Sequence, residues 1–198
     1  NGWAIQGLAA AALWLGDKDA LHLARRAAQW IIDNRSTTGG GFSHGTTDKN
    51  RLYLSDTLAM GRSLLALYAA TQDAKWLTRA RNAADFIEGH FVDLRQNGLP
   101  GFLTSRVEST RSAATYKPVV QRNENIRVLR FMNRLHRHTN QVRYHQLANR
   151  AMRYLSNTSI TGRHSVGGVL LAHWELEKAP IQSKLLARRV TFSATTEK

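Results

Sequence analysis

The sequence of 198 residues contains no cysteine, and its 14 acidic residues are outnumbered by 28 basic ones. Without cysteine, disulfide bonds, thiolate catalysis and cysteine-ligated zinc are excluded. No apolar run reaches the roughly 18 residues that a membrane-spanning helix needs, so no membrane association is expected. No charged leader followed by an apolar block opens the chain, so no export signal is found and a cytoplasmic location is favoured. Because an amphipathic segment begins almost at Asn1, we expect the chain to start inside a larger protein.

The net charge of +14 is concentrated between residues 122 and 163, where nine arginines accompany a single acid, Glu124. Such a region attracts nucleic acid, anionic lipid or an acidic protein surface. A solvated arginine-rich helix gives the same composition, since arginine is a good helix former, and this interpretation is favoured. Nucleic acid is therefore an unlikely partner, although the sequence does not exclude it.

Three segments of the chain repeat one another: LGDKDALHLARRAAQWI, TQDAKWLTRARNAADFI and TNQVRYHQLANRAMRYL. Small residues three apart with an aromatic residue three further on define one face of a helix. The offsets between the repeats are 56 residues (80 − 24) and 68 residues (148 − 80). The coinciding positions are Ala24, Ala80 and Ala148, then Ala27, Ala83 and Ala151, then Trp30, Phe86 and Tyr154. We expect each segment to be an amphipathic helix, with Trp30 and Trp76 packed between helices.

A more apolar segment precedes each repeat: WAIQGLAAAALWL, LAMGRSLLALYAA and NIRVLRFMNRLHRH. A helix that is apolar on most of its circumference is buried on several sides, so these segments predict an inner layer of helices. The predicted fold is all-α, with stacked α-hairpins forming a partial (α/α)6-type toroid. It comprises residues 1–180, about three and a half hairpins, and is followed by a basic, poorly ordered tail at 181–198. The long connecting loops gather at one end, where function usually lies.

The second unit, LSDTLAMGRSLLALYAATQDAKWLTRARNAADFIEGHF, resembles the helical domain of thioredoxin-domain proteins related to spermatogenesis-associated protein 20. The family motifs that match are leucine–x–aspartate before LLALY, then AT-x-D-x-x-WL, then the strand-like GFLT at 101–104. Asn1–Gly2 matches the start of an inner helix of that family, and GGVLLAHWELEKAP matches its last helix, so the resemblance extends to about Pro180. The chain departs from the family pattern at VVQRNENIRV and after Pro180.

This resemblance implies a toroid similar to N-acylglucosamine 2-epimerase and the six-hairpin glycosidases, with a cavity at its axis. It implies no settled reaction. It also implies a thioredoxin-fold domain in the full-length protein. Because three and a half hairpins leave the ring incomplete, we expect the rest to lie upstream or in a partner chain, which includes a homo-oligomer.

Two carboxylates are the catalytic candidates. Asp56, with Tyr53, opens the second inner helix and could supply acid–base or sugar-binding groups at the mouth of the cavity. Alternatively, Ser55 or Asp56 is only the helix N-cap. Glu124 could be a cavity carboxylate held ionised by Arg122 or Arg127, and a pair formed with Asp56 would suit glycoside chemistry.

The alternative for the third inner helix is that Asn123 caps it and Glu124 complements its dipole. The further ligand-binding candidates are Asn123, Arg127 and His44, together with Trp3 and Trp174. The two tryptophans could stack on a sugar ring, although packing in the core is favoured for both. His44 and Asp48 could join Asp56 at a metal ion, but no helical i, i+4 pair is present, so no metal is expected. No phosphate-loop motif is present, and no cofactor is expected.

Three functions remain open on the sequence. The favoured one is a toroid domain that binds a saccharide-like or other small polar ligand in an axial cavity. The second is an active sugar-processing enzyme of the epimerase or glycoside hydrolase kind. The third is a basic module that binds nucleic acid or an acidic protein through the arginine-rich region.

Overall fold

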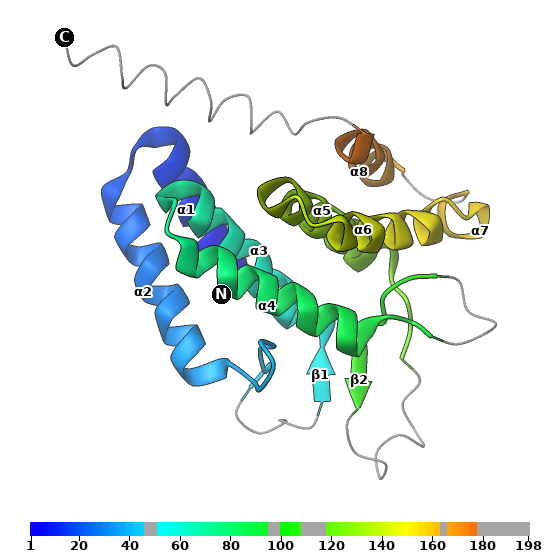
Figure 1. Ribbon diagram of the computed structural model, residues 1–198, viewed down its shortest axis with the longest axis horizontal. Helices are drawn as coiled ribbons and strands as arrows, with labels where there is room; N and C mark the ends of the chain where they lie inside the picture. Colours follow the sequence, from blue (N-terminus) through cyan, green and yellow to red (C-terminus); the bar gives the residue numbers. More distant parts are fainter. Residues whose placement is uncertain (46–50, 95–99, 108–117, 163–165, 178–198) are drawn as a thin grey trace.

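The computed structural model describes residues 1–45, 51–94, 100–107, 118–162 and 166–177, and within these ranges the chain forms eight helices and two short strands (Figure 1). No helix in these ranges is long and apolar enough to cross a membrane. In chain order the elements are α1 (Gly2–Leu15), α2 (Lys18–Arg35), β1 (Arg51–Tyr53), α3 (Leu54–Thr71), α4 (Ala74–Phe91), β2 (Ser105–Val107), α5 (Arg122–Thr139), α6 (Val142–Leu155), α7 (Thr158–Thr161) and α8 (Gly167–Glu177).

The helices form three consecutive hairpins, α1 with α2, α3 with α4 and α5 with α6. The first helices of the hairpins pack in sequence, α1 on α3 and α3 on α5, and α8 packs on the far side of α5. The inner layer is therefore an arc of α1, α3, α5 and α8, and α2, α4 and α6 lie outside it (Figure 1). This arrangement confirms the predicted all-α fold of stacked hairpins.

The turn within each hairpin is closed by a residue in the left-handed region. Gly16, Gln72 and Asn140 have φ values of 73°, 56° and 54° and donate their N–H groups to the carbonyl four residues earlier. The next helix begins at once because Asp17 and Asp73 cap α2 and α4 with their side chains. Such short connections make the two helices of a hairpin antiparallel neighbours.

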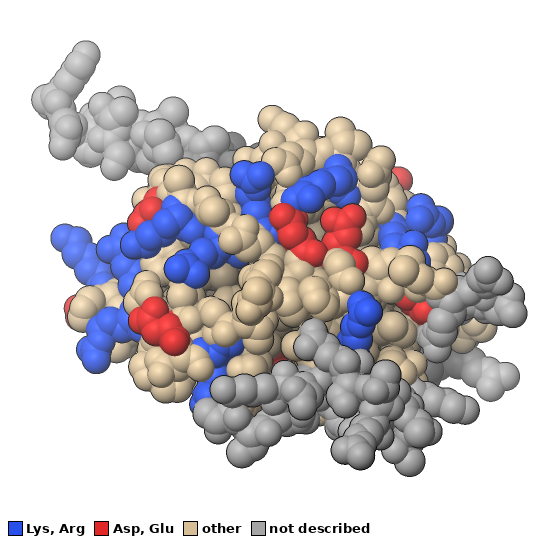
Figure 2. Space-filling view, turned by 60° about the horizontal axis from the view of Figure 1, so that its bottom comes forward, with Lys and Arg blue, Asp and Glu red and all other residues tan. Residues whose placement is uncertain are grey.

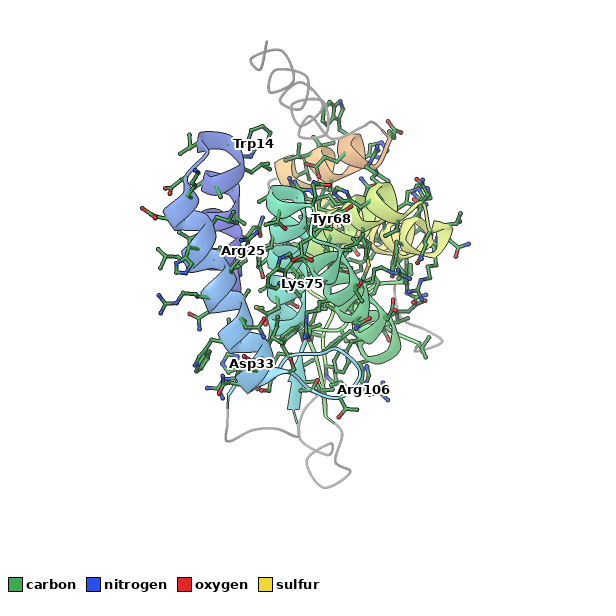
Figure 3. All side chains as sticks on the ribbon, turned by 60° about the vertical axis from the view of Figure 1, so that its left-hand side comes forward. Trp14, Arg25, Asp33, Tyr68, Lys75 and Arg106 are labelled. Carbon is green, nitrogen blue, oxygen red and sulfur yellow. The ribbon has the colours of Figure 1, made fainter. Side chains whose placement is uncertain are left out.

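The outer helices of neighbouring hairpins also interact through charge. The Lys75 N–H donates a hydrogen bond to Asp73 and lowers the pKa of that carboxyl group, and the charges of Lys75 and of Arg25 on α2 add to the effect. Figure 3 shows where Arg25 and Lys75 lie on the neighbouring helices α2 and α4.

Each hairpin is attached to the next by a Gly-Phe loop. The Phe42 N–H donates to Thr57 Oγ1 of α3 (3.1 Å), and the Phe102 N–H donates to Asn125 Oδ1 of α5 (2.9 Å). Both phenyl rings are buried. Thr57 and Asn125 are 68 residues apart (125 − 57), which is the offset between the second and third repeats, so the same contact recurs in both units.

The glycine before each phenylalanine lets the loop approach the outer helix of the next hairpin. A Cβ at Gly41 would lie 2.4 Å from the Phe86 ring, and one at Gly101 would lie 3.3 Å from the Tyr154 ring. Phe86 and Tyr154 are the repeated aromatic residues of α4 and α6, so the loop of one hairpin covers the aromatic residue of the next.

Trp30, the equivalent aromatic residue of α2, is 53% exposed, so the prediction that it packs between helices is wrong. The physical reason is that no hairpin within the described ranges supplies a loop to cover it. Trp30 instead lines an open groove between α1 and α2. Asn1 lines the same groove and lies 56 residues before Thr57 (57 − 1), the offset between the first two repeats. Trp76 is buried, as expected.

The two strands form a small antiparallel sheet that the all-α prediction did not include. Leu52 pairs with Arg106, and the Leu54 N–H at the start of α3 donates to the Thr104 carbonyl (2.9 Å). The pairing holds the chain that enters α3 beside the loop that follows α4. It therefore fixes Tyr53 at the N-terminal end of α3.

The helix α8 is attached to α5 through Glu175, whose side chain is buried. Arg130 of α5 donates from Nε and Nη2 to the two carboxylate oxygens (2.7 Å each), and Asn133 Nδ2 donates to the Glu175 carbonyl (2.6 Å). A bidentate guanidinium–carboxylate pair fixes orientation as well as distance. The predicted tail at 181–198 lies outside the described residues.

We expect Asn125→Ala to destabilise the protein by about 2–4 kcal/mol, because it leaves the buried N–H and carbonyl of Phe102 without partners. Asn123→Ala, two residues earlier and exposed, serves as the control and should change the free energy of unfolding by less than about 0.5 kcal/mol. Urea unfolding measures both. Equal losses in the two variants would contradict the role assigned to the loop contact.

Candidate functional site

Six of the predicted site residues are linked by contacts or charge at the N-terminal ends of α1, α3 and α5. We call this set the carboxylate cluster: Trp3, His44, Tyr53, Asp56, Glu124 and Arg127. Trp3, Asp56 and Glu124 lie in the first turns of the three inner helices. Because these helices run in the same direction around the arc, their first turns share one end of it (Figure 1).

Asp56 interacts with the loop before its helix. Both carboxylate oxygens lie 3.1 Å from His44 Nδ1, and the His44 ring centroid is 5.4 Å from that of Tyr53. The residue at the N-cap of α3 is Tyr53, which makes no side-chain capping bond. The alternative in which Ser55 or Asp56 is the N-cap is therefore wrong, and the Asp56 carboxylate is directed to His44 instead.

Glu124 is partly buried in the first turn of α5, and its Oε2 atom is buried without a hydrogen-bond partner. Burial raises the pKa of this carboxyl group, the Arg127 charge opposes the rise, and the Asp56 charge adds to it. The expectation that a neighbouring arginine holds Glu124 ionised is thus outweighed by desolvation.

Asn123 does not join this cluster. The helix α5 begins at Arg122 with Gln121 at its N-cap, so the predicted capping role of Asn123 is wrong. Its exposed side chain lines a shallow groove with Tyr154 and Ser159. Trp174 is partly buried on α8 and does not line the cavity that lies between α1, α3 and α5.

Trp3 is 56% exposed and lies beneath two guanidinium groups. The Arg127 guanidinium is 4.3 Å from the centre of the ring, and the Arg62 guanidinium is 5.6 Å from it. Cation–π attraction holds arginines over a tryptophan face. An exposed aromatic ring beside hydrogen-bonding groups is a suitable platform for a flat, partly apolar ligand such as a sugar ring.

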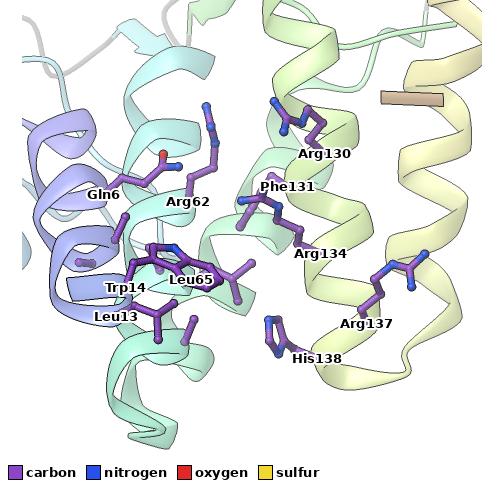
Figure 4. A pocket seen from close by; sticks show the side chains of 14 residues that line it. Gln6, Leu13, Trp14, Arg62, Leu65, Arg130, Phe131, Arg134, Arg137 and His138 are labelled. Carbon is purple, nitrogen blue, oxygen red and sulfur yellow. The ribbon is translucent and has the colours of Figure 1, made fainter. Parts of the chain in front are cut away.

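A cavity of about 230 Å³ lies between α1, α3 and α5 on the inner side of the arc (Figure 4). Its apolar wall includes Trp14, Leu65 and Phe131. Its ionisable lining residues are all basic: Arg62, Arg130, Arg134, Arg137 and His138. Arg62 connects the cavity to the carboxylate cluster, because it lines the one and lies over Trp3 in the other.

Of the arginines at the cavity and the carboxylate cluster, Arg127 was predicted as a site residue, whereas Arg62, Arg130 and Arg134 were not. A signal for the last two was present. The arginines at 127, 130, 134 and 137 follow one another at intervals of three or four residues, which places them on one face of α5. Arg62 is a single base in an apolar inner helix, and nothing in the local pattern marks it.

The eight arginines that the structure describes between residues 122 and 153 do not form one basic face. Arg143 of α6 pairs with Asp85 of α4, and Arg150 donates to the Asp93 backbone carbonyl. Both guanidinium groups therefore have their partners on the outer side of the arc. On the face shown in Figure 2, Lys and Arg lie in several groups with acidic side chains between them. The basic region is thus divided between the outer surface and the axial cavity.

Within the described ranges, no group of three or more His, Asp or Glu side chains is placed to hold a metal ion. Asp48, which the metal hypothesis also invoked, lies outside those ranges.

Solved structures with the same fold are sugar-processing proteins. A family 76 α-mannanase of Bacteroides thetaiotaomicron is similar with a TM-score of 0.62 and 17% identity, over 78% of this chain and 42% of that one. Cellobiose 2-epimerase of Bacillus thermoamylovorans has a TM-score of 0.61 and 14% identity, over 75% and 41%. A D-mannose isomerase has a TM-score of 0.63 and 15% identity, over 79% and 40%.

At these identities the likeness shows the fold alone. The chain therefore has the six-hairpin glycosidase-like (α/α)6 toroid fold and forms an arc of it. It spans about two fifths of the length of these neighbours. No protein-family model matches the chain, and no curated protein matches it in sequence.

We expect Glu124→Gln to raise the melting temperature at pH 7 but not at pH 4. The pKa of Glu124 in the folded protein lies above its ordinary value of 4.5. Below both pKa values the group is protonated in the folded and unfolded states, and stability falls as pH rises through the interval between them. Glutamine does not ionise, so the variant does not lose this stability as the pH rises.

Glu177→Gln, at an exposed position of α8, is the control for the loss of a carboxyl group. The measurement is thermal unfolding of the wild type, Glu124→Gln and Glu177→Gln at pH 4 and pH 7. An equal shift for Glu124→Gln at both pH values would show that burial does not perturb this group.

Proposed function

We propose that the carboxylate cluster binds a saccharide-like or similarly small polar ligand at the axis of the arc. The observation that carries this proposal is that an exposed tryptophan, Trp3, and two carboxyl groups, Asp56 and Glu124, lie in the first turns of three neighbouring inner helices. Tryptophan offers a face on which a sugar ring stacks, and carboxyl groups accept hydrogen bonds from its hydroxyls. The sugar-processing neighbours support the proposal through their shared fold.

A second function, sugar processing, is favoured by the chemistry of Glu124. Because burial raises its pKa, Glu124 retains a proton more readily than an exposed glutamate and is suited to act as a general acid. Asp56, hydrogen-bonded to His44, would be the second group at the substrate. An epimerase- or glycoside hydrolase-like reaction needs both groups to reach the same sugar ring.

The groove at Trp30 supports a proposal about the larger protein to which this chain belongs. Asn1 and Trp30 occupy the positions that receive a Gly-Phe loop in the next two units, so we infer that a preceding hairpin of a larger protein covers them. The resemblance noted in the sequence supports a thioredoxin-fold domain in that protein. A homo-oligomer remains the other proposed way to complete the ring.

Calorimetric titration with mannose and with cellobiose tests the saccharide proposal. We expect measurable binding that Trp3→Ala weakens by about five- to thirtyfold, since stacking on an aromatic ring contributes on the order of 1–2 kcal/mol. Trp30→Ala is the matched control, because Trp30 is also about half exposed but lies in the groove between α1 and α2. Absence of binding, or an equal effect of the two variants, would refute the proposal.

The enzymatic alternative has its own readout. Proton NMR of the same sugars incubated with the protein follows epimerisation or hydrolysis directly. A reaction that stops in Glu124→Gln and in Asp56→Asn would support it, and binding without any turnover would limit the site to recognition.

A further inference from the structure

The cavity between α1, α3 and α5 has an excess of partly buried positive charge. Arg62, Arg130 and Arg134 line it, and the acid that interacts with all three is Glu175, which is engaged by Arg130 in a bidentate pair. In the part of the chain that the structure describes, no carboxylate forms an ion pair with Arg62 or Arg134. Three guanidinium groups thus share one carboxylate.

The pKa values of Arg62 and Arg134 are lowered in these surroundings. Burial and the charges of Arg134, Arg130 and Arg127 lower the pKa of Arg62 to about 10, and the Glu175 charge opposes this only in part. Burial also lowers the pKa of Arg134, with Glu175 opposing and Arg130 contributing, and its Nε atom is buried without a hydrogen-bond partner. A buried charge without a counter-charge costs free energy, so these side chains are poorly satisfied in the free protein.

Arginine is suited to bind a carboxylate or phosphate group that would balance this charge. Its planar guanidinium presents parallel N–H donors that match the two oxygens of a carboxylate or a phosphate. Figure 4 shows Arg62 on α3 and Arg134 on α5 at the space between these helices, with Phe131 beside Arg134 and Leu65 below them. An anionic group held there would meet donors from two helices and an apolar wall.

We propose that this cavity binds the anionic group of a sugar acid or sugar phosphate. The inference rests on the proposed function, since it assigns the sugar ring to Trp3 and the anion to Arg62 and Arg134. Arg62 joins the two places, because it lines the cavity and its guanidinium lies 5.6 Å from the centre of the Trp3 ring. Neutral sugars would bind only through the carboxylate cluster.

The test is calorimetric titration with glucose, glucuronate, glucose 6-phosphate and inorganic phosphate. We expect at least one of the two anionic sugars to bind at least about tenfold more tightly than glucose, since a charge-assisted hydrogen bond contributes about that factor. Comparison of glucuronate with glucose 6-phosphate identifies the anionic group. Arg134→Gln should remove the preference and leave the affinity for glucose unchanged. Arg62→Gln should also remove the preference, but it changes the surroundings of Trp3 as well.

Arg153→Gln, at an exposed position of α6, removes the same charge away from the cavity and should change nothing. Arg134→Lys should bind with intermediate affinity, because it keeps the charge and loses the paired donors. Melting temperatures give a second readout. The free Arg134→Gln protein should melt no lower than the wild type, since an uncompensated buried charge has been removed.

The outcomes separate the two proposals. If glucose binds as tightly as the anionic sugars, the anion site is refuted while saccharide binding stands. If phosphate and the anionic sugars bind and glucose does not, the anion site stands and the saccharide proposal is refuted. Binding of heparin that depends on Arg134, with no binding of the monosaccharides or phosphate, would refute both and identify a polyanion surface.

Discussion

The contact on which the arc depends is the attachment of each Gly-Phe loop to the following inner helix. Phe42 binds Thr57, and Phe102 binds Asn125, through a backbone N–H that a buried side-chain oxygen accepts. Because an unpaired buried N–H is costly, the loop has one favourable position, and the helix it binds begins at a fixed point beside it. The first turns of α3 and α5 are thereby set at the same end of the arc, and Asp56 and Glu124 with them.

The inner side of the arc is electrostatically divided. Carboxyl groups lie at the N-terminal ends of the inner helices, and guanidinium groups lie further along α3 and α5. Close contact between the helices leaves little solvent to screen these charges, so Glu124 and Arg62 both have shifted pKa values, each toward its neutral form. Such perturbation at a concave surface is typical of a binding or catalytic site.

Periodicity predicted the fold because the repeat is nearly regular. The repeated alanines and the aromatic residues Phe86 and Tyr154 define a packed face of the outer helices. The hairpin turns lie at Gly16 and Asn140, which adopt the left-handed conformation. Trp30 has the same pattern but no hairpin over it, and a sequence repeat cannot show whether a neighbour is present. Asp56 and Glu124 were found as acids at helix starts. Arg62 was missed because its role depends on the distance between α3 and α5, which sequence spacing does not encode.

The most direct test of the account uses the five tryptophans as reporters. In a ¹⁵N-labelled sample each indole N–H gives its own NMR signal, and titration with glucuronate shows which of them meets the ligand. We expect the signals of Trp3 and Trp14 to shift, because Trp3 belongs to the carboxylate cluster and Trp14 lines the cavity. The signals of Trp30 and Trp76 should stay in place. A shift at Trp30 without one at Trp3, or no shift at any tryptophan, would contradict it.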